Sequence, residues 1–336
     1  MKSMVARLLF LFTLVLLSKG SIYSQLKFDL EASYFVEIPS DTAIVLNGQT
    51  LPTIGGLSGI DYDAKTGHYL LISDAGKKNG NGRYYVLDID LENDFSIEFK
   101  EVVYLPKGKL RGEGIRTLDN GLLITDERTI NRRERSFFFH IDKENNMTEI
   151  PLPKTYKKPM WDNSGFEGLG LSEDGNKAFI ALERAMPEST DRYMVGILEY
   201  NIQDVNITPK EYYYPLQRKM PGNGISEVVA FDDTSLLVIE RDWVSPNNYV
   251  TLYSVNLKGS ENNNPESGGS TPVLKPTKVF SFPNTVEIGN KTFKVNNIEG
   301  ATFSPDGEFL ILVSDNNFGN NCDCTPTQLV FLKIQK

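Results

Sequence analysis

The sequence predicts an all-β fold, a β-propeller of five four-stranded blades, and three observations support this prediction. Five similar hairpin units recur along the chain, each with an apolar segment, a turn rich in Asp, Gly or Asn, and a second apolar segment. Further β-rich runs follow each hairpin, and no amphipathic helix is evident beyond the first 25 residues. Four short strands per repeat with turns between them are typical of a propeller blade.

The hairpins share a pattern of acidic residues at their open ends. The five units are "GLSGIDYDAKTGHYLLISDAG", "GEGIRTLDNGLLITDER", "GFEGLGLSEDGNKAFIALER", "ISEVVAFDDTSLLVIER" and "IEGATFSPDGEFLILVSDNN". Four units begin with Glu, at Glu113, Glu167, Glu227 and Glu299, and the first has Ser58 at the matching place. All five close on an acid, at Asp74, Asp126 or Glu127, Glu183, Glu240 and Asp315. Repeats of this length favour a propeller over a β-sandwich.

The remaining β-rich runs supply the outer strands of each blade. Third strands are expected at 83–91, 135–142, 192–202, 248–257 and 327–334, and fourth strands include 95–106 and 207–216. The last unit ends after its third strand, and residues 26–38 could supply the fourth. This pairing would close the ring and leave no open sheet edge. A sixth, poorly matched blade is the alternative, using residues 284–295 and their flanks.

The N-terminus resembles a secretory signal peptide. Lys2 and Arg7 precede the ten-residue apolar run 8–17, which is too short to span a bilayer. We therefore expect residues 1–25 to be removed and residues 26–336 to form one secreted or periplasmic domain. Loss of Lys2, Arg7 and Lys19 would take the formal charge from −9 to −12. Such an acidic chain is not expected to bind nucleic acid or an anionic membrane surface, and we expect a monomer.

Two segments are expected to be peripheral to the fold. Residues 258–272 form a polar insertion rich in Gly, Ser and Asn, which is typical of a surface loop. Cys322 and Cys324, the two cysteines of the chain, form "NCDC" near the C-terminus. They are interpreted as a local disulfide or two thiols in a loop, because a soft-metal site would need more ligands nearby.

The hairpin pattern predicts a crowd of carboxylates at one end of the channel. In an antiparallel hairpin the residue before the first strand lies beside the residue after the second, away from the turn. Glu167 is therefore expected beside Glu183, and the other units bring their acids together in the same way. Carboxylates at such distances repel, and a proton, an Arg or a hard divalent cation such as Ca²⁺ must neutralise some of them. As a structural alternative, each inner Glu could accept backbone N–H bonds and fasten neighbouring blades together.

Arginine follows the closing Glu in three units, as Arg128, Arg184 and Arg241, while Arg111 and Arg116 flank Glu113. Each Arg could reach a carboxylate of a neighbouring blade or an anionic ligand. The usual hydrolase motifs are missing: the chain has two His, His68 and His140, and "GGLSGI" fails to match G-x-S-x-G. An enzyme with this sequence is expected to use carboxylates, a metal and Arg.

These same blocks resemble the phytase-like esterase family, a group of secreted β-propeller proteins. The resemblance rests on "GLSGIDYD", "GEGIRTLDNGLLITDER", "NSGFEGLGLSEDG", "LLVIERD" and "NIEGATFSPDG", which run in order from about residue 53 to the C-terminus. It implies a hydrolase of phosphate or carboxylic esters. It identifies no nucleophile, and a dedicated phosphate cluster for phytate is not matched.

The leading hypothesis is a secreted, metal-assisted ester hydrolase acting on a small anionic ester, with Ca²⁺ as the expected metal. The inner ligands or bases would be Glu113, Glu167, Glu227 and Glu299. The second set of carboxylates, for the metal, would be Asp74, Asp126, Glu127, Glu183, Glu240 and Asp315. The anion would be bound by Arg128, Arg184 and Arg241. The alternatives are a non-catalytic binding propeller with a structural metal, and a propeller lactonase or lyase.

Overall fold

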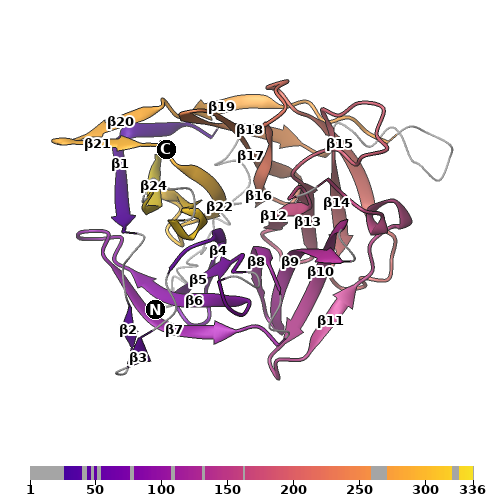
Figure 1. Cartoon of the computed structure of the whole chain (residues 1–336), viewed down its shortest axis with the longest axis horizontal. Helices are drawn as coiled ribbons and strands as arrows, with labels where there is room; N and C mark the ends of the chain where they lie inside the picture. Colours follow the sequence, from indigo (N-terminus) through magenta and orange to yellow (C-terminus); the bar gives the residue numbers. More distant parts are fainter. Residues whose placement is uncertain are drawn as a thin grey trace, which may run out of the picture.

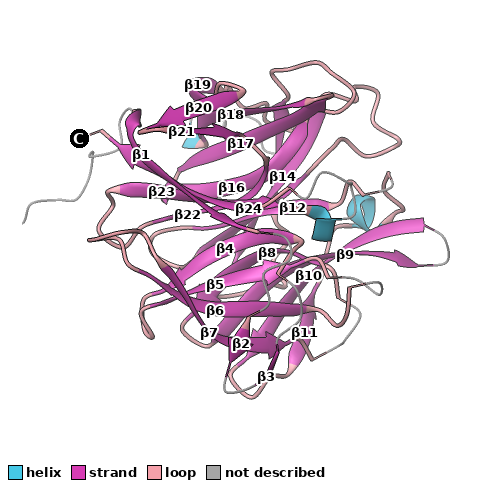
Figure 2. Cartoon of the chain, turned by 60° about the vertical axis from the view of Figure 1, so that its left-hand side comes forward, coloured by secondary structure: helices cyan, strands magenta, loops and turns pink. Residues whose placement is uncertain are grey.

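The computed structural model is a five-bladed β-propeller, which confirms the predicted fold (Figure 1). The structure describes residues 26–39, 44–46, 49–50, 54–75, 79–106, 110–130, 133–161, 163–258, 271–319 and 325–335. Three predictions concern residues outside the described part of the chain: the expected signal peptide 1–25, residues 259–270 of the polar insertion, and Cys322 with Cys324. Almost all of the described chain is strand or loop, with short 3-10 turns at Lys154–Lys157 and Asn317–Gly319 (Figure 2).

Each blade is a four-stranded antiparallel sheet. The first contains β4 (Leu57–Asp63), β5 (His68–Ser73), β6 (Arg83–Ile89) and β7 (Ile97–Tyr104). The second contains β8 (Gly112–Leu118), β9 (Gly121–Ile130), β10 (Arg133–Asp142) and β11 (Met147–Ile150). The third contains β12 (Phe166–Leu171), β13 (Lys177–Leu182), β14 (Met194–Asn201) and β15 (Lys210–Pro215). The fourth contains β16 (Gly224–Asp232), β17 (Ser235–Val244), β18 (Asn247–Asn256) and β19 (Thr277–Ser281).

The fifth blade joins the two ends of the chain. It contains β22 (Asn297–Phe303), β23 (Phe309–Asp315), β24 (Thr327–Ile334) and the N-terminal β1 (Phe28–Ile38). Strand β1 runs antiparallel to β24, with Phe35 opposite Val330. The expected ring closure is therefore confirmed, and it covers an edge of the last sheet that would otherwise be open.

Two small hairpins lie outside the blades. Residues 284–295 form β20 (Thr285–Ile288) and β21 (Lys291–Lys294), a two-stranded sheet rather than a sixth blade. Phe293 of this hairpin stacks on Phe35 of β1, with ring centroids 5.1 Å apart, so the hairpin packs against the closing strand. The second hairpin consists of β2 (Val45–Leu46) and β3 (Gln49–Thr50).

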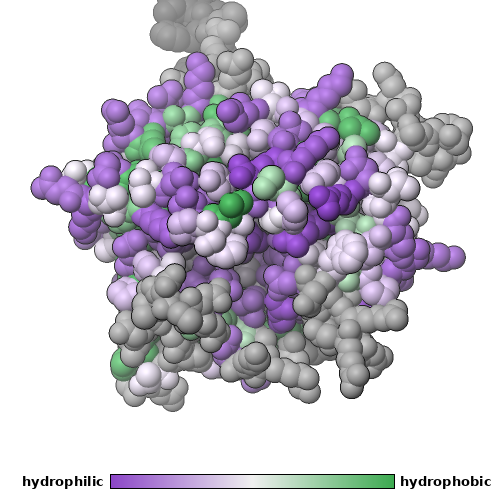
Figure 3. Space-filling model, turned by 45° about the horizontal axis from the view of Figure 1, so that its top comes forward, coloured by the Kyte–Doolittle hydropathy of each residue, from purple (hydrophilic) through white to green (hydrophobic). Residues whose placement is uncertain are grey.

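The hydrophobic core lies between adjacent blades. One cluster joins the first and second blades, through side chains such as Ile72 and Ile124. Others join the second to the third and the third to the fourth, the fourth to the fifth, and the fifth back to the first. Burial on both faces explains why the inner strands read as short continuous apolar runs. Among the described residues, no helix is long and apolar enough to cross a membrane, and the face in Figure 3 is mostly hydrophilic with isolated hydrophobic spots.

Every inner strand carries a β-bulge at the same level of the ring. The pairing of β4 with β5 shifts between Leu57 and Gly59, and the other four hairpins shift at matching places. A bulge turns one side chain away from the regular alternation and often occurs next to a functional site. A glycine follows the bulge in four strands: Gly59, Gly114, Gly168 and Gly300. A Cβ on Gly168 would lie 2.8 Å from the Val228 nitrogen, so glycine permits close approach of neighbouring strands.

Candidate functional site

The strand register defines two rings of side chains at one mouth of the channel. The opening ring occupies the bulges and consists of Ser58, Glu113, Glu167, Ser226 and Glu299. The closing ring consists of the matching residues at the ends of the second strands: Asp74, Glu127, Glu183, Arg241 and Asp315. Backbone bonds fix the pairing, as when the Glu183 N–H donates to the Gly165 carbonyl at 2.8 Å. The predicted gathering of opening and closing acids is thus present in the structure.

The fourth blade differs from the other four by one residue. Ser226 occupies its bulge, so Glu227 lies where the other strands have glycine. On the second strand Glu240 pairs with Ile225, and Arg241 takes the place that an acid occupies in the other blades. The sequence pattern aligned Glu227 and Glu240 with the acids of the rings, whereas the structure places both of them outside the mouth.

Glu227 lies deeper in the channel and forms a buried ion pair with Arg116. Their carboxylate and guanidinium groups are 3.1 Å apart, and the two residues are 1% and 3% exposed. The Glu227 carboxylate also accepts the N–H groups of Leu169, Val228 and Ala301.

The Arg116 guanidinium completes this network. It donates to the carbonyls of Ile60 and Ile115 on one side and of Ala301 on the other. Through these bonds the Arg116–Glu227 pair touches the inner strand of every blade. For Glu227, the geometry supports the structural alternative of fastening blades together.

Two further predicted acids are also held inside the protein. The Glu240 carboxylate accepts hydrogen bonds from the Tyr214 hydroxyl, the Gln217 N–H and the Asn223 amide. Asp126 accepts the Arg111 N–H at 2.7 Å and is fully buried. Neither residue is among the described residues that line the cavity. Glu127, whose N–H donates to the Arg111 carbonyl at 3.0 Å, takes the register position of the closing acid in the second blade, rather than Asp126.

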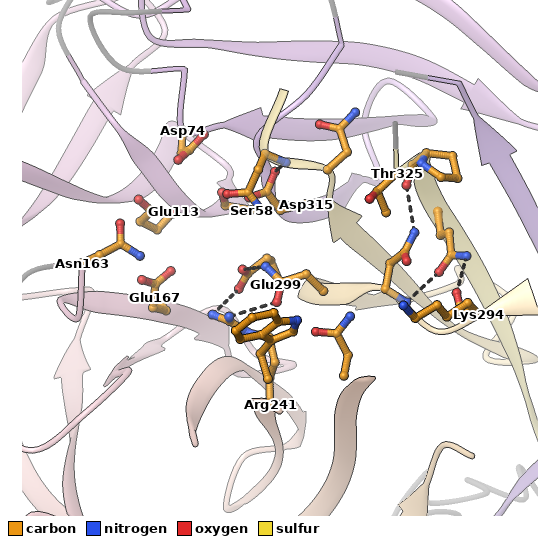
Figure 4. Close-up of a pocket in the computed structure, with 18 of the residues that line it drawn as sticks. Ser58, Asp74, Glu113, Asn163, Glu167, Arg241, Lys294, Glu299, Asp315 and Thr325 are labelled. Carbon is orange, nitrogen blue, oxygen red and sulfur yellow. Dashed lines mark hydrogen bonds and ion pairs between the residues drawn. The ribbon is translucent and has the colours of Figure 1, made fainter. Parts of the chain in front are cut away.

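A cavity of about 1100 Å³ opens at this mouth, which is large enough for a ligand of several rings. Its acidic side contains Asp74, Glu113 and Glu167, while Ser58, Glu299 and Asp315 lie towards its middle (Figure 4). Lys294 and Thr325 lie on the far side (Figure 4). Side chains from four of the five blades therefore converge on one hollow, together with Arg241 and Trp243 from the remaining blade.

Two carboxylates of the cavity wall, Glu113 and Glu167, and the adjacent Glu127 are close enough to share one cation. One oxygen each from Glu113, Glu127 and Glu167 lies within 4.8 Å of the other two, and all three residues are buried. In the described part of the chain no hydrogen bond or ion pair reaches the Glu167 carboxylate. Among the described residues, the Glu113 carboxylate contacts Arg111 at 3.9 Å. The Glu127 carboxylate accepts the Ser164 N–H at 2.8 Å. Glu113 and Glu167 therefore hold the weakly compensated charge of this cluster.

Two arginines compensate other carboxylates of the cavity. Arg241 lies 3.0 Å from Glu299 and 3.4 Å from Glu183, and it donates to the Asn297 amide oxygen at 2.9 Å. Arg111 lies 3.6 Å from Asp74 and donates to Asn163 at 2.7 Å. The cavity thus has an arginine-compensated part, around Arg241, and the weakly compensated carboxyls of Glu113 and Glu167.

Burial and mutual repulsion raise the pKa values of the cavity carboxyls. For Glu113 and Glu167 burial is the main cause, followed by neighbouring carboxylates, and their pKa values lie well above the usual range. Burial and the charge of Asp315 raise the pKa of Asp74 to about 8. Burial raises the pKa of Glu299 to about 8 even though Arg241 opposes the shift. Without a bound cation, several of these groups hold protons at neutral pH.

The other predicted residues fall into three groups. Glu183 contacts Arg241 and Arg184, but Arg184 is not among the described residues that line the cavity. The side chain of Arg128 lies outside the described part of the structure. Neither histidine lines the cavity, and His68 bonds to Asp88 at the far end of its hairpin.

Sequence reasoning missed several residues of the cavity wall. Asn163, Trp243, Asn297 and Lys294 line it but belong to loops, strand ends or the outer hairpin. Arg111 was noticed only as a neighbour of Glu113. The "NN" that directly follows Asp315, the last closing acid, was the available signal for Asn316 and Asn317, which also line the wall.

Comparisons with known proteins agree with the fold. The family model "Phytase-like: Esterase-like activity of phytase" matches residues 52–318. A search of curated proteins finds no match to this sequence.

Several solved structures are similar in shape. One is from the GH130 family, described as containing glycoside hydrolases that target β-1,2-mannosidic linkages in Candida mannan. It has a TM-score of 0.51 and 9% identity, covering 91% of this chain and 93% of that chain. A glycosyl hydrolase from Bacteroides ovatus has a TM-score of 0.49 and 7% identity, covering 88% and 90%. An α-L-arabinofuranosidase from Lactobacillus brevis has a TM-score of 0.47 and 12% identity, covering 83% and 91%. At 9% identity, the first likeness shows the fold alone.

Proposed function

This chain belongs to the phytase-like family, and we propose that it is an ester hydrolase, of the phosphoesterase or esterase type, assisted by a divalent metal ion. The observation that carries the proposal is the buried cluster of Glu113, Glu127 and Glu167, of which Glu113 and Glu167 line a large cavity. Such a concave, polar site with perturbed pKa values is the usual location of a reaction centre. We further propose that the protein acts outside the cytoplasm, because of the leader-like segment 1–25.

The donor set of the cluster fits a hard cation, and Ca²⁺ is our expectation. All three ligands are carboxylate oxygens, which Ca²⁺ prefers over soft ligands. Oxygens bound to one Ca²⁺ lie about 2.3–2.6 Å from it, so opposite oxygens are separated by up to about 5 Å. The spread of the three oxygens, within 4.8 Å, agrees with that geometry. When bound, the ion would supply positive charge to polarise the ester and to displace protons from the cluster.

The other residues of the cavity have roles that follow from their positions. Arg241 points into the cavity and can bind an anionic oxygen of the ester while it remains paired with Glu299. Asp74 and Glu299 line the cavity outside the cluster and can accept a proton from an attacking water or return it to the leaving alcohol. Asp315 is held in place by the Asn317 N–H at 2.7 Å and adds to the negative field. Glu227, Glu240 and Asp126 have no contact with the cavity and carry no catalytic role in this proposal.

The test combines metal binding with turnover in the same samples. Residues 26–336 are treated with EDTA and then titrated with Ca²⁺, while the melting temperature and the hydrolysis of p-nitrophenyl phosphate, p-nitrophenyl acetate and a γ-lactone are recorded. We expect Ca²⁺ to raise the melting temperature and to restore turnover of one ester. Glu167→Gln should abolish both effects because it removes a metal ligand.

Glu149→Gln is the matched control, since Glu149 is an exposed residue of β11 in the blade that carries Glu113 and Glu127. It should retain both responses. A raised melting temperature with no turnover of any substrate would favour the binding propeller with a structural metal. Turnover of the lactone alone would indicate a lactonase. Full Ca²⁺-dependent turnover in Glu167→Gln would refute the metal site.

A further inference from the structure

An exposed tryptophan lines the outer wall of the cavity. Trp243 lies near the end of β17 and is 60% exposed, although it belongs to the cavity wall. No hydrogen bond, ring contact or cation–π contact to it occurs in the described part of the chain. Exposing a large aromatic side chain is unfavourable unless a ligand covers it, because its apolar surface remains in water.

The strand places Trp243 in a defined relation to Arg241. Side chains alternate along β17, so Glu240 and Asp242 point to one side while Arg241 and Trp243 point to the other. Asp242 is buried and bonded to Arg218, which fixes this alternation. Two residues along a strand span about 7 Å, so Trp243 lies one step further out from the acids than Arg241. A sugar ring joined to an ester group spans a similar distance.

The wall near Trp243 offers uncharged hydrogen-bonding groups. Asn248 lies opposite Trp243 in the β17–β18 register, and its amide nitrogen donates to the Val295 carbonyl at 3.3 Å. This leaves the amide oxygen of Asn248 available to a ligand hydroxyl. Ser245, two residues after Trp243 in the chain, adds a hydroxyl group that both donates and accepts. Groups of this kind match the hydroxyls of a sugar, which also donate and accept.

The charges of the cavity argue against a polyanionic ligand. The described cations of the wall are Arg111, Arg241 and Lys294, and both arginines are already paired with carboxylates. Six acids line the same cavity: Glu37, Asp74, Glu113, Glu167, Glu299 and Asp315. One anionic ester group could bind at Arg241 and a metal, but further phosphates would meet a negative field.

We propose that Trp243 forms a subsite for an uncharged sugar ring, with the ring stacked on the indole and its hydroxyls bonded to Asn248 and the neighbouring hydroxyl group. This inference rests on the proposed hydrolase function for its catalytic meaning: the sugar is the alcohol part of a monoester. Water adds its oxygen to the acyl carbon or phosphorus, the bond from that atom to the sugar oxygen breaks, and the sugar oxygen takes a proton. The substrate class is therefore a singly esterified sugar.

Binding can be measured without catalysis because the chain has two tryptophans, Trp161 and Trp243. Trp161 is 53% exposed but is not among the described residues of the cavity wall, so Trp161→Phe leaves Trp243 as a single reporter. This variant is titrated in EDTA with the methyl glycosides of glucose, galactose, mannose and xylose. We expect a saturable fluorescence change with at least one of them. By calorimetry, Trp243→Ala should weaken that glycoside about tenfold or more, which corresponds to about 1.4 kcal/mol, whereas Trp161→Ala should bind like the wild type.

Other ligands separate this subsite from its alternatives. Cyclohexanol has the apolar ring without the set of hydroxyls, and it should bind more weakly than the glycoside. A response to choline but to no glycoside would overturn the proposal in favour of a cation site. The absence of glycoside binding, or equal binding by Trp243→Ala, would also overturn it. Glycoside binding without ester turnover would instead leave the subsite intact and refute the hydrolase.

Discussion

Two groups of buried charges lie close together along the inner strands, and they differ in how the protein compensates them. The Arg116–Glu227 pair closes the channel, and both of its side chains are bonded to each other and to backbone groups from all five blades. One residue earlier, at the bulges, Glu113 and Glu167 face each other and Glu127, and among the described residues Glu113 and Glu167 have little compensation of their own. The same residue type thus occurs in a satisfied and in an unsatisfied environment.

This difference in compensation distinguishes buried charges with a structural role from buried charges that could bind a ligand. A buried charge that is fully hydrogen-bonded contributes to the folded state, and removal of its partner is costly. Buried carboxylates that face one another make the folded state less stable, so they persist where a ligand supplies the missing charge. Compensation, rather than burial or pKa alone, therefore identifies the mouth of the channel as the site: the pKa of Glu227 is also raised, to about 7, by burial.

The largest loss of stability is expected when the Arg116–Glu227 pair is broken. Arg116→Met leaves the Glu227 carboxylate buried without its counter-charge and removes bonds to the carbonyls of Ile60 and Ala301. We expect the free energy of unfolding to fall by about 4 kcal/mol, as for other buried ion pairs that lose one partner. Urea denaturation in EDTA at pH 7 measures the change.

Arg192→Met is a suitable control, because Arg192 is exposed and, among the described residues, its side chain contacts its neighbour Tyr193. A change within about 0.5 kcal/mol is expected there. The double variant Arg116→Met, Glu227→Met should lose less than the sum of the two single changes, since it leaves no charge behind. A loss below about 1 kcal/mol in Arg116→Met would remove the distinction between the pair and the cavity carboxylates.

The fold could be predicted from the sequence because each blade repeats a local pattern. The hairpin turns, the alternation of apolar runs and the acid at each open end recur in every blade, and their spacing alone predicts strand pairing. The unmatched first strand at 26–38 was enough to predict the ring closure that β1 and β24 form. Within the blades local pairing rules sufficed, since apart from β1 and β24 the paired strands are also neighbours in the sequence.

The candidate site could be predicted only in part, because the register of the strand pairing decides which residues form the opening and closing rings. The pattern "ISEVV" contains a Glu, but the bulge falls on Ser226, and a shift of one residue sends Glu227 into the channel. The same shift places Arg241 among the closing acids. Glycine after Glu113, Glu167 and Glu299 was the available signal, since Glu227 has no glycine after it. Contacts between blades, such as that of Arg116 with Ala301, cannot be predicted from the spacing of residues along the sequence.

A smaller loss of stability is expected when the pH rises. It comes from the carboxyls of the cavity rather than from the Arg116–Glu227 pair. Burial raises the pKa values of Asp74 and Glu299 to about 8, above their usual values near 4. Such groups stabilise the fold fully below the lower, unfolded pKa, and this stability is lost as pH rises through the folded pKa. The metal-free protein should therefore lose unfolding free energy between pH 5 and pH 8, at up to about 1.4 kcal/mol per pH unit for each proton.

The pH dependence is measured by urea denaturation in EDTA and again in Ca²⁺. Ca²⁺ should flatten the curve, because the ion replaces the protons that the cluster would otherwise hold. Stability that rises from pH 5 to pH 8 in EDTA would show that the carboxyls have ordinary or lowered pKa values. The contrast between the pair and the cavity would then have no electrostatic basis.

The smallest predicted change is a gain in stability, whereas the others are losses. It is the sharpest test of the comparison between the Arg116–Glu227 pair and the cavity carboxylates. Glu167→Gln replaces a carboxyl that no described donor contacts with a neutral amide of similar shape. The folded wild type must take up a proton at this residue near neutral pH, since burial and the Glu113 charge hold its pKa well above the usual range. The variant has no such requirement. We therefore expect metal-free Glu167→Gln to be more stable than the wild type by about 1–2 kcal/mol at pH 8.

The gain should disappear as the pH falls, because below the unfolded pKa both states of the wild type carry the proton and the two proteins become equivalent. Paired unfolding curves at pH 8 and pH 4.5 in EDTA therefore separate electrostatic relief from better packing, which would persist at both pH values. With Ca²⁺ the order should reverse, since the wild type gains the binding energy of the ion and the variant has lost a ligand. A variant less stable than the wild type in EDTA at pH 8 would mean that Glu167, like Glu227, holds the blades together.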